Sequence, residues 1–199
     1  MTGVADKEKR AFQGGLVVVS GPSGSGKTTI VERLREDPRV DVAVTATTRN
    51  KREGERDGVD YFFLTEDEFR ARIAEDQFVE YEEVFGNGRL YGSLKAPLEE
   101  GIRRKDRIYL LEIDVFGGLT LKRKGYSGTY VFIAPPSLDV LRQRIEGRGS
   151  ETEESIRERL SKAQVELDKQ AHYDEVVVND DLDQAFLRVR EILGLNATP

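Results

Sequence analysis

The chain has 199 residues, of which 38% are hydrophobic and 34% charged, with a formal net charge of -6 and no cysteine. This length suits a single functional unit with a sizeable apolar core, and the missing cysteines exclude disulfides, thiolate zinc sites and thiol catalysis. The negative charge argues against sequence-independent binding of DNA or RNA, which needs a broad basic surface, so any anion site must be local.

The first segments have the order strand, loop, helix. Gly15 to Ser20 is a valine-rich run without alternation, which is typical of a strand buried on both faces of a parallel sheet. Apolar residues at helical spacing then predict a helix from Thr28 that stops before Pro38. Residues 42–44 form a short strand candidate. Residues 45–60 are polar and interrupted by glycine, which predicts an exposed segment.

A small subdomain is expected to interrupt this core. Thr65 and Glu68 have the spacing of a capping box ahead of a helix through about Ala74. Residues 78–85 then alternate apolar and polar side chains as a strand would. We therefore interpret residues 45–94 as an insertion.

The second half returns to alternating helices and strands, which favours a parallel sheet. Ser137 is a candidate helix cap, and Ser150 with Glu153 has the spacing of a second capping box. The expected elements are a helix near 96–104, a strand 108–113, a helix near 119–124, a strand 129–133, a helix to about 146, a long helix to about Tyr173, a strand 176–178 and a helix 182–193.

The turn after the first strand matches the phosphate-binding pattern G-x-x-x-x-G-K-[ST]. Its glycines let backbone N–H groups converge on a phosphate, and the helix N-terminus adds a partial positive charge. The lysine reaches the outer phosphates, and the threonine hydroxyl can ligate Mg²⁺. A glycine-rich turn with an incidental lysine is the alternative, which the flanking strand and helix disfavour. The candidate ATP-binding residues here are Gly21, Pro22, Ser23, Gly24, Ser25, Gly26, Lys27, Thr28 and Thr29, with Lys27 also catalytic and Thr28 the metal ligand.

A triphosphate site alone leaves ATPases, GTPases, motors and kinases open. No guanine-reading N-K-x-D segment is present, and helicases or motors need a larger body, so a small-molecule kinase fits best. An acceptor phosphate is already largely ionised at neutral pH, so such an enzyme needs cations rather than a general base. Arginines suit this task because their forks bind phosphate oxygens bidentately, although solvated surface charges are the plain alternative. The candidates are Arg49 and Arg52 in the insertion, and Arg144, Arg148, Arg157 and Arg159 around a later charged segment.

The order of further motifs resembles the guanylate kinase family from about Leu16 to Leu193. The matching stretches are Thr47-Thr48-Arg49, Arg52-Glu53-Gly54-Glu55, Gly58-Val59-Asp60-Tyr61-Phe62-Phe63, Phe78-Val79-Glu80-Tyr81, Tyr91-Gly92-Ser93, Leu111-Glu112-Ile113-Asp114, Ala134-Pro135-Pro136-Ser137, Gly147-Arg148-Gly149 and Val178-Asn179-Asp180-Asp181.

The resemblance implies a P-loop NTPase-type three-layer α/β/α core with a parallel sheet, an inserted GMP-binding subdomain and a short lid. The implied domain is a single one over 1–199, with core segments 14–44, 95–146 and 155–195, the GMP-binding insertion at about 45–94 and the lid at about 147–154. The implied activity is ATP-dependent phosphorylation of GMP, and of dGMP, to the diphosphate, with Mg²⁺ as cofactor.

The resemblance also implies residue roles. Arg49, Arg52 and Tyr61 match positions that hold the GMP phosphate, and Arg148 and Arg159 match catalytic lid arginines. Around the guanine base it places Thr45, Glu80, Ser93 and Asp114, with Tyr91 beside them, and near the adenine of ATP it places Arg144 and Asn179.

Two of these carboxylates have their own chemical argument. Guanine offers two parallel donors, N1–H and the N2 amino group, which the Glu80 carboxylate can accept together, whereas adenine would leave it poorly satisfied. An exposed strand glutamate is the alternative. Asp114 follows an apolar strand, where P-loop enzymes often place a magnesium-water ligand, so that reading stays open beside the base-site reading. His172, the only histidine, is expected to be structural or exposed.

Some residues depart from the family pattern. The loop at Gly88, Arg89 and Leu90 is about two residues longer than usual, Phe116 stands where glutamine is common, and Ser93-Leu94 replaces two small hydroxyl residues. Two rivals follow: a guanylate-kinase-like interaction module without catalysis, and a monophosphate kinase with another base preference.

The expected partners are the small molecules ATP and GMP, with no nucleic acid and no membrane. No apolar run approaches the roughly 20 residues that span a bilayer. Met1 to Gln13 lacks the apolar stretch of a secretory signal, and the absence of cysteine suits a reducing compartment, so a cytoplasmic location is expected. The sequence leaves the choice between monomer and homo-oligomer open.

Overall fold

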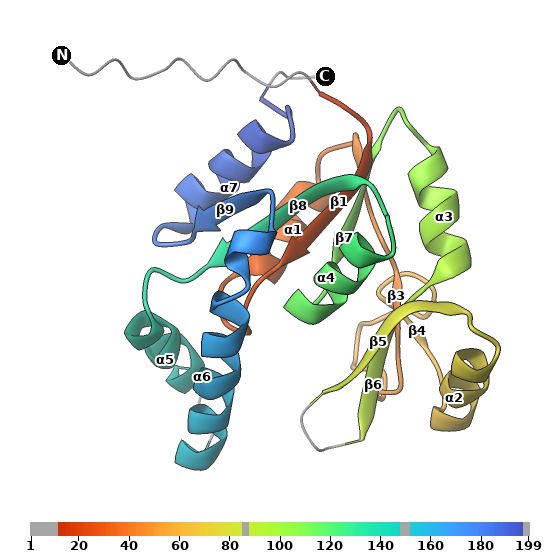
Figure 1. Ribbon diagram of the computed structural model, residues 1–199, viewed down its shortest axis with the longest axis horizontal. Helices are drawn as coiled ribbons and strands as arrows, with labels where there is room; N and C mark the ends of the chain where they lie inside the picture. The colour runs from red at the N-terminus through yellow and green to blue at the C-terminus, as the bar shows by residue number, and fades with distance from the viewer. Residues whose placement is uncertain (1–11, 85–87, 148–151, 197–199) are drawn as a thin grey trace.

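The computed structural model describes residues 12–84, 88–147 and 152–196, which form two β-sheets with helices around them (Figure 1). None of the helices in these ranges has both the length and the apolar composition needed to cross a bilayer.

The larger sheet has five strands in the order β2-β7-β1-β8-β9, and every neighbouring pair is parallel. The central strands are covered on both faces, and they are therefore continuous apolar runs rather than alternating ones. In β1, Leu16, Val17, Val18 and Val19 are at most 4% exposed. The parallel sheet predicted from the sequence is confirmed. Its strands are β1 (Gly15–Ser20), β2 (Val40–Val42), β7 (Ile108–Glu112), β8 (Gly128–Ala134) and β9 (Glu175–Val178).

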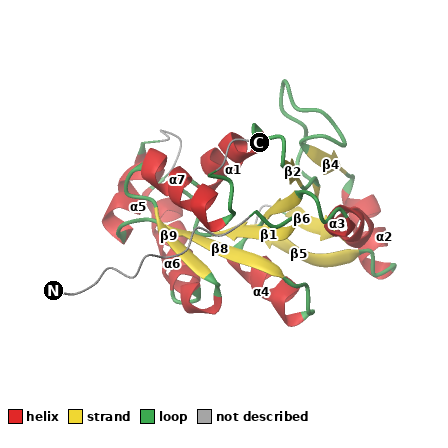
Figure 2. Cartoon of the chain, turned by 90° about the horizontal axis from the view of Figure 1, so that it is seen from above, coloured by secondary structure: helices red, strands yellow, loops and turns green. Residues whose placement is uncertain are grey.

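Helices cover both faces of this sheet and make a three-layer core (Figure 2). On one face, α1 (Lys27–Arg35) and α7 (Leu182–Ile192) bury their apolar sides against the strands. On the other face, α3 (Lys95–Arg103) and α4 (Val115–Arg123) do the same. The predicted α/β/α arrangement is therefore confirmed, and the carboxyl ends of β1 and β7 open toward a common site.

The second sheet has the strand order β4-β3-β6-β5, and its members come from within the range predicted as an insertion. Its apolar face packs on α2, where the rings of Phe69 and Phe78 stack with centroids 4.3 Å apart. The elements are β3 (Thr45–Thr47), β4 (Tyr61–Phe63), α2 (Glu66–Ala74), β5 (Phe78–Val84) and β6 (Arg89–Leu94).

Two further helices pack on each other beyond the carboxyl end of the large sheet. They are α5 (Leu138–Glu146) and α6 (Glu153–Leu167), and their shared apolar cluster includes Leu141, Ile145 and Ile156. Ser137 caps α5 as predicted, because its hydroxyl accepts a hydrogen bond from the Val140 N–H.

Three predictions from the sequence were wrong in detail. The segment 45–60 is not simply exposed, because Ala46 and Thr47 lie fully buried in β3 at the centre of the second sheet. The helix expected near 119–124 begins at Val115, since Asp114 caps it. The long helix ends at Leu167 rather than at Tyr173, and only a short 3₁₀ turn, Gln170–His172, follows it.

The entry to α6 also differs from the expected capping box. Thr152 is the N-cap, and its hydroxyl accepts a hydrogen bond from the Ser155 N–H. Ser150, the cap predicted from the sequence, lies outside the described residues, and so do Phe85 at the end of the predicted strand and residues 148–151 of the predicted lid. The capping box of Thr65 and Glu68 on α2 is confirmed in both directions.

Candidate functional site

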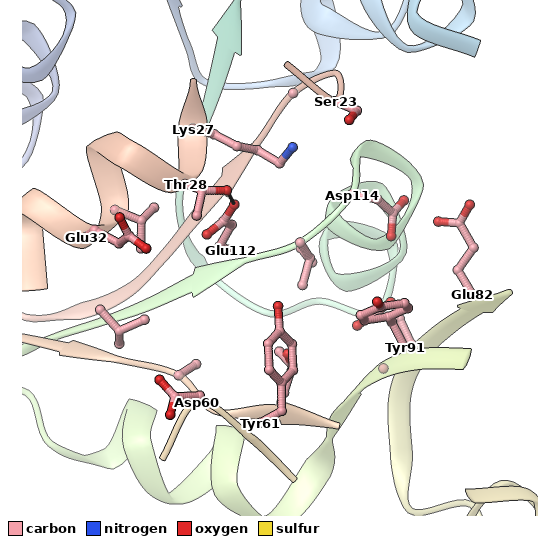
Figure 3. A pocket seen from close by; sticks show the side chains of 18 of the residues that line it. Ser23, Lys27, Thr28, Glu32, Asp60, Tyr61, Glu82, Tyr91, Glu112 and Asp114 are labelled. Carbon is pink, nitrogen blue, oxygen red and sulfur yellow. Dashed lines mark hydrogen bonds between the residues drawn. The ribbon is translucent and has the colours of Figure 1, made fainter. Parts of the chain in front are cut away.

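The glycine-rich turn connects the end of β1 to the start of α1, as its sequence pattern requires. Gly24 and Gly26 both have φ of 88°, in the left-handed region where a side chain would be strained. Gly26 is also the N-cap of α1, so the free N–H groups of the helix and its positive dipole end face the loop. Lys27 is the first residue of α1, and Figure 3 shows its ammonium group directed into a cavity. The local geometry is that of an anion cradle.

Asn179 supports this loop from behind. Its side-chain amide donates a 2.7 Å hydrogen bond to the Ser25 carbonyl, and the residue is only 3% exposed. A Cβ on Gly26 would come within 2.2 Å of the same amide nitrogen, so glycine is needed there for close approach as well as for its φ. Arg144 on α5 in turn donates to the backbone carbonyl of Asn179 at 2.8 Å. The two residues predicted near adenine therefore lie together, next to the loop.

Thr28 meets a residue that the sequence reasoning did not single out. Its hydroxyl donates a 2.6 Å hydrogen bond to Glu112 at the carboxyl end of β7 (Figure 3). A hydroxyl and a carboxylate at the end of a phosphate loop are oxygen ligands of the kind that Mg²⁺ prefers, so the predicted metal fits these side chains. Within the described ranges, no three Asp, Glu or His side chains come together as a protein-only metal cage.

A cavity of about 600 Å³ extends from the phosphate loop to the second sheet. Lys27 and Thr28 lie on one side of it, and Tyr61 and Tyr91 point into it from the opposite side (Figure 3). Of the predicted site residues, its lining contains Gly21, Ser23, Lys27, Thr28, Thr45, Arg52, Tyr61, Glu80, Tyr91, Asp114 and Arg159. Residues predicted for two different substrates thus share one cavity.

Glu80 on β5 lines the cavity on the side of the second sheet. Its carboxylate accepts a 2.6 Å hydrogen bond from the Ser93 hydroxyl, and Glu80 is 8% exposed. Burial raises the pKa of Glu80 to about 7, although the hydrogen bond from Ser93 acts in the opposite direction. Ser93 therefore does not line the cavity itself. It holds Glu80, which does. The prediction of an exposed strand glutamate, the alternative, is excluded by this burial.

Gly117 is a second residue that the sequence did not reveal. A Cβ at this position would lie 2.9 Å from one Glu80 oxygen and 3.0 Å from an oxygen of Asp114. Its φ is ordinary, so glycine is required here by space rather than by backbone conformation. The missing side chain leaves the two carboxylates room beside the cavity.

Asp114 caps helix α4, and its contacts bear on the two roles predicted for it, at the guanine base or as a magnesium-water ligand. One of its oxygens accepts hydrogen bonds from the Phe116 and Gly117 N–H groups at 2.8 and 2.9 Å, so the side chain caps α4. The other oxygen is near Gly117 on the side of Glu80. The carboxylate that meets Thr28 is that of Glu112, which favours the base-site reading of Asp114. Phe116, which departs from the family pattern, is 39% exposed.

Arg49 and Glu55 form a bidentate ion pair in the predicted phosphate clamp. Two guanidinium nitrogens of Arg49 bind the Glu55 oxygens at 2.9 and 2.7 Å, and the arginine lies 5.2 Å from the centre of the Tyr61 ring. The guanidinium lowers the pKa of Glu55 to about 2, and the carboxylate raises the pKa of Arg49 above its ordinary value. Glu55 also accepts a hydrogen bond from the Arg52 backbone N–H at 2.7 Å, so it holds the Arg49 side chain and the Arg52 main chain together.

Tyr61 supplies a neutral donor to the same region. Burial, followed by the negative charge of Glu112, raises the pKa of its phenol, so the hydroxyl stays protonated across the physiological range. Its ring meets the Tyr91 ring edge-on, with centroids 6.2 Å apart. Thr45 on β3 completes the set of cavity-lining residues predicted for the acceptor.

Helix α6 brings its own charges to the cavity. The Arg159 guanidinium lies 3.4 Å from the Ser23 hydroxyl of the phosphate loop. Lys162, one turn later, binds the Glu82 carboxylate on β5 at 2.6 Å. Glu166 is 5% exposed, and its burial raises its pKa to about 7. Arg148, the other predicted catalytic arginine, lies outside the described residues. Arg157 is exposed on α6 and lies 3.8 Å from Glu153.

Sequence reasoning therefore named residues of the phosphate loop and of a predicted acceptor clamp but missed several residues that contact them. Glu112 could have been found from its place at the end of a buried parallel strand. Glu55 lies in the matching stretch Arg52-Glu53-Gly54-Glu55, although its contact with Arg49 was not predicted. The others give no local signal, because their roles depend on contacts between segments far apart in the chain: Glu82, Gly117, Lys162 and Glu166.

Comparison with known proteins agrees with this geometry. A family model described as guanylate kinase matches residues 13–195. Guanylate kinase from Salinibacter ruber is 47% identical over 185 residues, covering 90% of this chain and 97% of that protein. Guanylate kinase from Clostridium perfringens strain SM101 is 46% identical over 182 residues, covering 91% and 83%. The crystal structure of guanylate kinase from Anaplasma phagocytophilum superimposes with a TM-score of 0.69 at 30% identity, covering 90% of this chain and 84% of that one.

Proposed function

Because this chain belongs to the guanylate kinase family, we propose that its phosphate loop, its second sheet and α6 divide the work of one phosphoryl transfer among them. The chain is an ATP-dependent guanylate kinase, which converts GMP to GDP. The assignment of individual residues to this reaction rests on one observation. A single cavity is lined both by Lys27 and Thr28 of the phosphate loop and by Tyr61 and Glu80 of the second sheet.

ATP is assigned to the loop side of the cavity. The N–H groups at the start of α1 and the Lys27 ammonium bind the phosphates and stabilise the charge that develops on them. Thr28, beside Glu112, would hold Mg²⁺, which when bound neutralises phosphate charge. Asn179 keeps the loop in shape through the Ser25 carbonyl, and its own side-chain oxygen is buried without a hydrogen-bond partner in the described structure. A donor on the adenine side would satisfy that oxygen.

GMP is assigned to the side of the second sheet. Arg49, Arg52 and the Tyr61 hydroxyl bind its phosphate, with Glu55 holding the Arg49 guanidinium and the Arg52 backbone. The ionised Glu80 carboxylate accepts the N1–H and N2 donors of guanine. Adenine presents an acceptor at its N1 and would leave the buried carboxylate unsatisfied, which is the origin of base selectivity.

No general base is needed for the transfer itself. The attacking oxygen belongs to the GMP phosphate, whose second pKa of about 6 leaves it largely ionised at neutral pH. The chain's task is to hold the two phosphates in line, exclude water and spread negative charge. Lys27 and Arg159 are the cations assigned to the transferring group, together with Arg148 on the lid.

The rival readings are disfavoured by specific residues. An interaction module without catalysis has no need of Lys27, the Thr28–Glu112 pair and an acceptor clamp around one cavity. A different base preference has no observation of its own here, because Glu80 and its partner Ser93 are both in place. The proposal also includes a cytoplasmic location and the use of dGMP as a second acceptor.

Two arginine substitutions in the same loop test the residue assignment. Both arginines are exposed, but only Arg52 lines the cavity. We expect Arg52→Met to raise KM for GMP roughly tenfold or more, with little change in KM for ATP. Arg56→Met is the matched control, and Lys27→Met should reduce kcat instead. Equal effects of Arg52→Met and Arg56→Met on KM for GMP would contradict the proposed clamp.

A further inference from the structure

Helix α6 presents three ionic side chains to the cavity on one face. Arg159, Lys162 and Glu166 follow one another at intervals of three and four residues, which places them on the same side of a helix. Arg159 reaches the phosphate loop at Ser23. Lys162 reaches the opposite, acceptor side of the cavity at Glu82. One helix face therefore contacts both the donor and the acceptor regions.

The contact on the acceptor side is close and partly sheltered from water. The Lys162 ammonium lies 2.6 Å from a Glu82 oxygen and 3.9 Å from a Glu166 oxygen. The side chains of Lys162 and Glu82 are 25% and 29% exposed. Such an ion pair is screened less than a surface pair, so breaking it has a larger effect.

Glu82 lies on the same strand face as the base-reading carboxylate. Glu80 and Glu82 are two residues apart on β5, so their side chains point the same way, and both line the cavity. Figure 3 shows the Glu82 carboxylate near Asp114. Any shift of β5 that follows from guanine binding at Glu80 is therefore passed to Glu82, and through it to α6.

We propose that Lys162 and Glu82 form a clasp that couples the acceptor strand β5 to α6 and so positions Arg159 for phosphoryl transfer. Lys162 is a positioning residue: it acts one helical turn from Arg159, and anchoring it fixes the rotation and height of that turn relative to β5. The inference rests on the proposed role of Arg159. It links the acceptor strand to the placement of a cation at the donor phosphates.

The chemistry around the clasp explains why a lysine is needed there. Glu82, Asp114 and Glu166 all lie close to Lys162 or to one another, so the ammonium balances a local excess of negative charge. Without it, Glu82 and Asp114 repel each other, and β5 loses its attachment to α6. Loss of either partner of the clasp should therefore uncouple the same two elements.

A double-mutant cycle on the full-length protein tests the clasp. We expect Lys162→Met and Glu82→Gln each to lower kcat roughly tenfold. The double variant should have a kcat no lower than that of the less active single variant. That outcome corresponds to an interaction energy of about 1.4 kcal/mol. Lys122→Met is the matched control, because it removes a 2.5 Å ion pair to Asp174 that does not line the cavity. Additive losses, or losses no larger than in Lys122→Met, would overturn the proposal.

A binding measurement separates positioning from simple loss of structure. The probes are the non-hydrolysable analogue AMP-PNP and GMP, titrated calorimetrically, with thermal unfolding as the check on folding. In the wild type we expect GMP to tighten AMP-PNP binding. In both clasp variants the factor by which GMP increases AMP-PNP affinity should be about tenfold smaller, while AMP-PNP binding without GMP is unchanged. Unaltered coupling in both variants would overturn the clasp. An Arg159→Met variant with wild-type kcat would instead refute the proposed role of Arg159.

Discussion

The Ser93 hydroxyl donates a 2.6 Å hydrogen bond to the Glu80 carboxylate, and both residues are less than a tenth exposed. Ser93 lies on β6 and Glu80 on the neighbouring strand β5, so the pair is fixed by the sheet itself. Burial nevertheless raises the pKa of Glu80 to about 7. The proposed role of Glu80 requires its ionised form, because only the ionised carboxylate can accept both guanine donors.

The acceptor kinetics should therefore depend on pH near neutrality. We expect kcat/KM for GMP in the wild type to rise through two steps, one near pH 7 for Glu80 and one near pH 6 for the GMP phosphate itself. Glu80→Gln should lower kcat/KM for GMP about 100-fold and remove only the step near pH 7. A Glu80→Gln profile with both steps intact would show that another group titrates.

Glu80→Gln should lower kcat/KM for GMP but raise the stability of the folded protein. The folded-state pKa of Glu80 lies above its ordinary value of 4.5, so the native state binds this proton more tightly than the unfolded state. Its contribution to stability is present below pH 4.5 and is lost as the pH rises through about 7. Urea unfolding without substrates should show Glu80→Gln gaining stability relative to wild type between pH 5 and pH 8. A constant difference over this range would contradict the raised pKa.

Gly117→Ala tests the space beside the base site. The new methyl group would lie within 3.0 Å of oxygens of both Glu80 and Asp114, so one carboxylate must move. We expect KM for GMP to rise roughly tenfold, in line with the usual cost of overpacking, while KM for ATP stays unchanged. Gly118→Ala provides a contrast, because its methyl group would meet the Tyr173 hydroxyl at 2.4 Å and should reduce stability instead. Unchanged GMP kinetics in Gly117→Ala would contradict the crowding.

Asn179→Ala tests the support of the phosphate loop. It removes the 2.7 Å hydrogen bond to the Ser25 carbonyl and leaves that buried carbonyl without its side-chain donor. The expected cost is about 1–3 kcal/mol of stability, with a higher KM for ATP and little change in KM for GMP. Thermal unfolding and steady-state kinetics measure the two effects. Loss of GMP affinity with unchanged ATP affinity would contradict the assignment of Asn179 to the ATP side of the cavity.

A stability prediction concerns Asp37, far from the substrates. It binds Arg39 at 2.9 and 2.8 Å and Arg190 at 3.2 Å, and its hydrogen bond with Arg39 lowers its pKa to about 2. The stabilisation is present above the ordinary value of 3.8 and is lost as the pH falls through about 2. Asp37→Asn should cost about 1–3 kcal/mol at pH 7, a deficit that shrinks below pH 4.

Asp41→Asn is the control for that experiment. Asp41 also pairs with an arginine, Arg107 at 2.8 Å, but both side chains are about a third exposed. A surface pair of this kind contributes roughly 0–1 kcal/mol. Equal losses of unfolding free energy from Asp37→Asn and Asp41→Asn, measured by urea unfolding at pH 7, would contradict the larger contribution expected from Asp37.

The sequence predicted those features that depend on local patterns. The buried strand Gly15–Ser20, the phosphate loop after it and the capping box at Thr65 all carry their signal within a few residues. It failed for β3, because Thr45–Thr47 is polar by composition and becomes a central strand only through its pairing with β4 and β6. Tertiary pairing overrode local propensity there.

The candidate site divides in the same way. Lys27 and Thr28 were predictable from a motif with a mechanism, and Glu80 from the family resemblance. The Thr28–Glu112 contact joins residues 84 positions apart, and the Lys162–Glu82 contact joins residues 80 apart. No periodicity or spacing can reveal such pairs, because they exist only once two separate elements are folded against the same cavity.

The central claim is that Glu80 and the phosphate loop act in one cavity to make this chain a GMP-selective kinase. The most direct test is ADP formation from ATP and Mg²⁺ with GMP, dGMP, AMP, CMP or UMP as the acceptor. We predict turnover with GMP and a kcat/KM for AMP lower by about 10⁴, a preference that Glu80→Gln largely removes. Comparable kcat/KM values for AMP and GMP in the wild type would contradict the account.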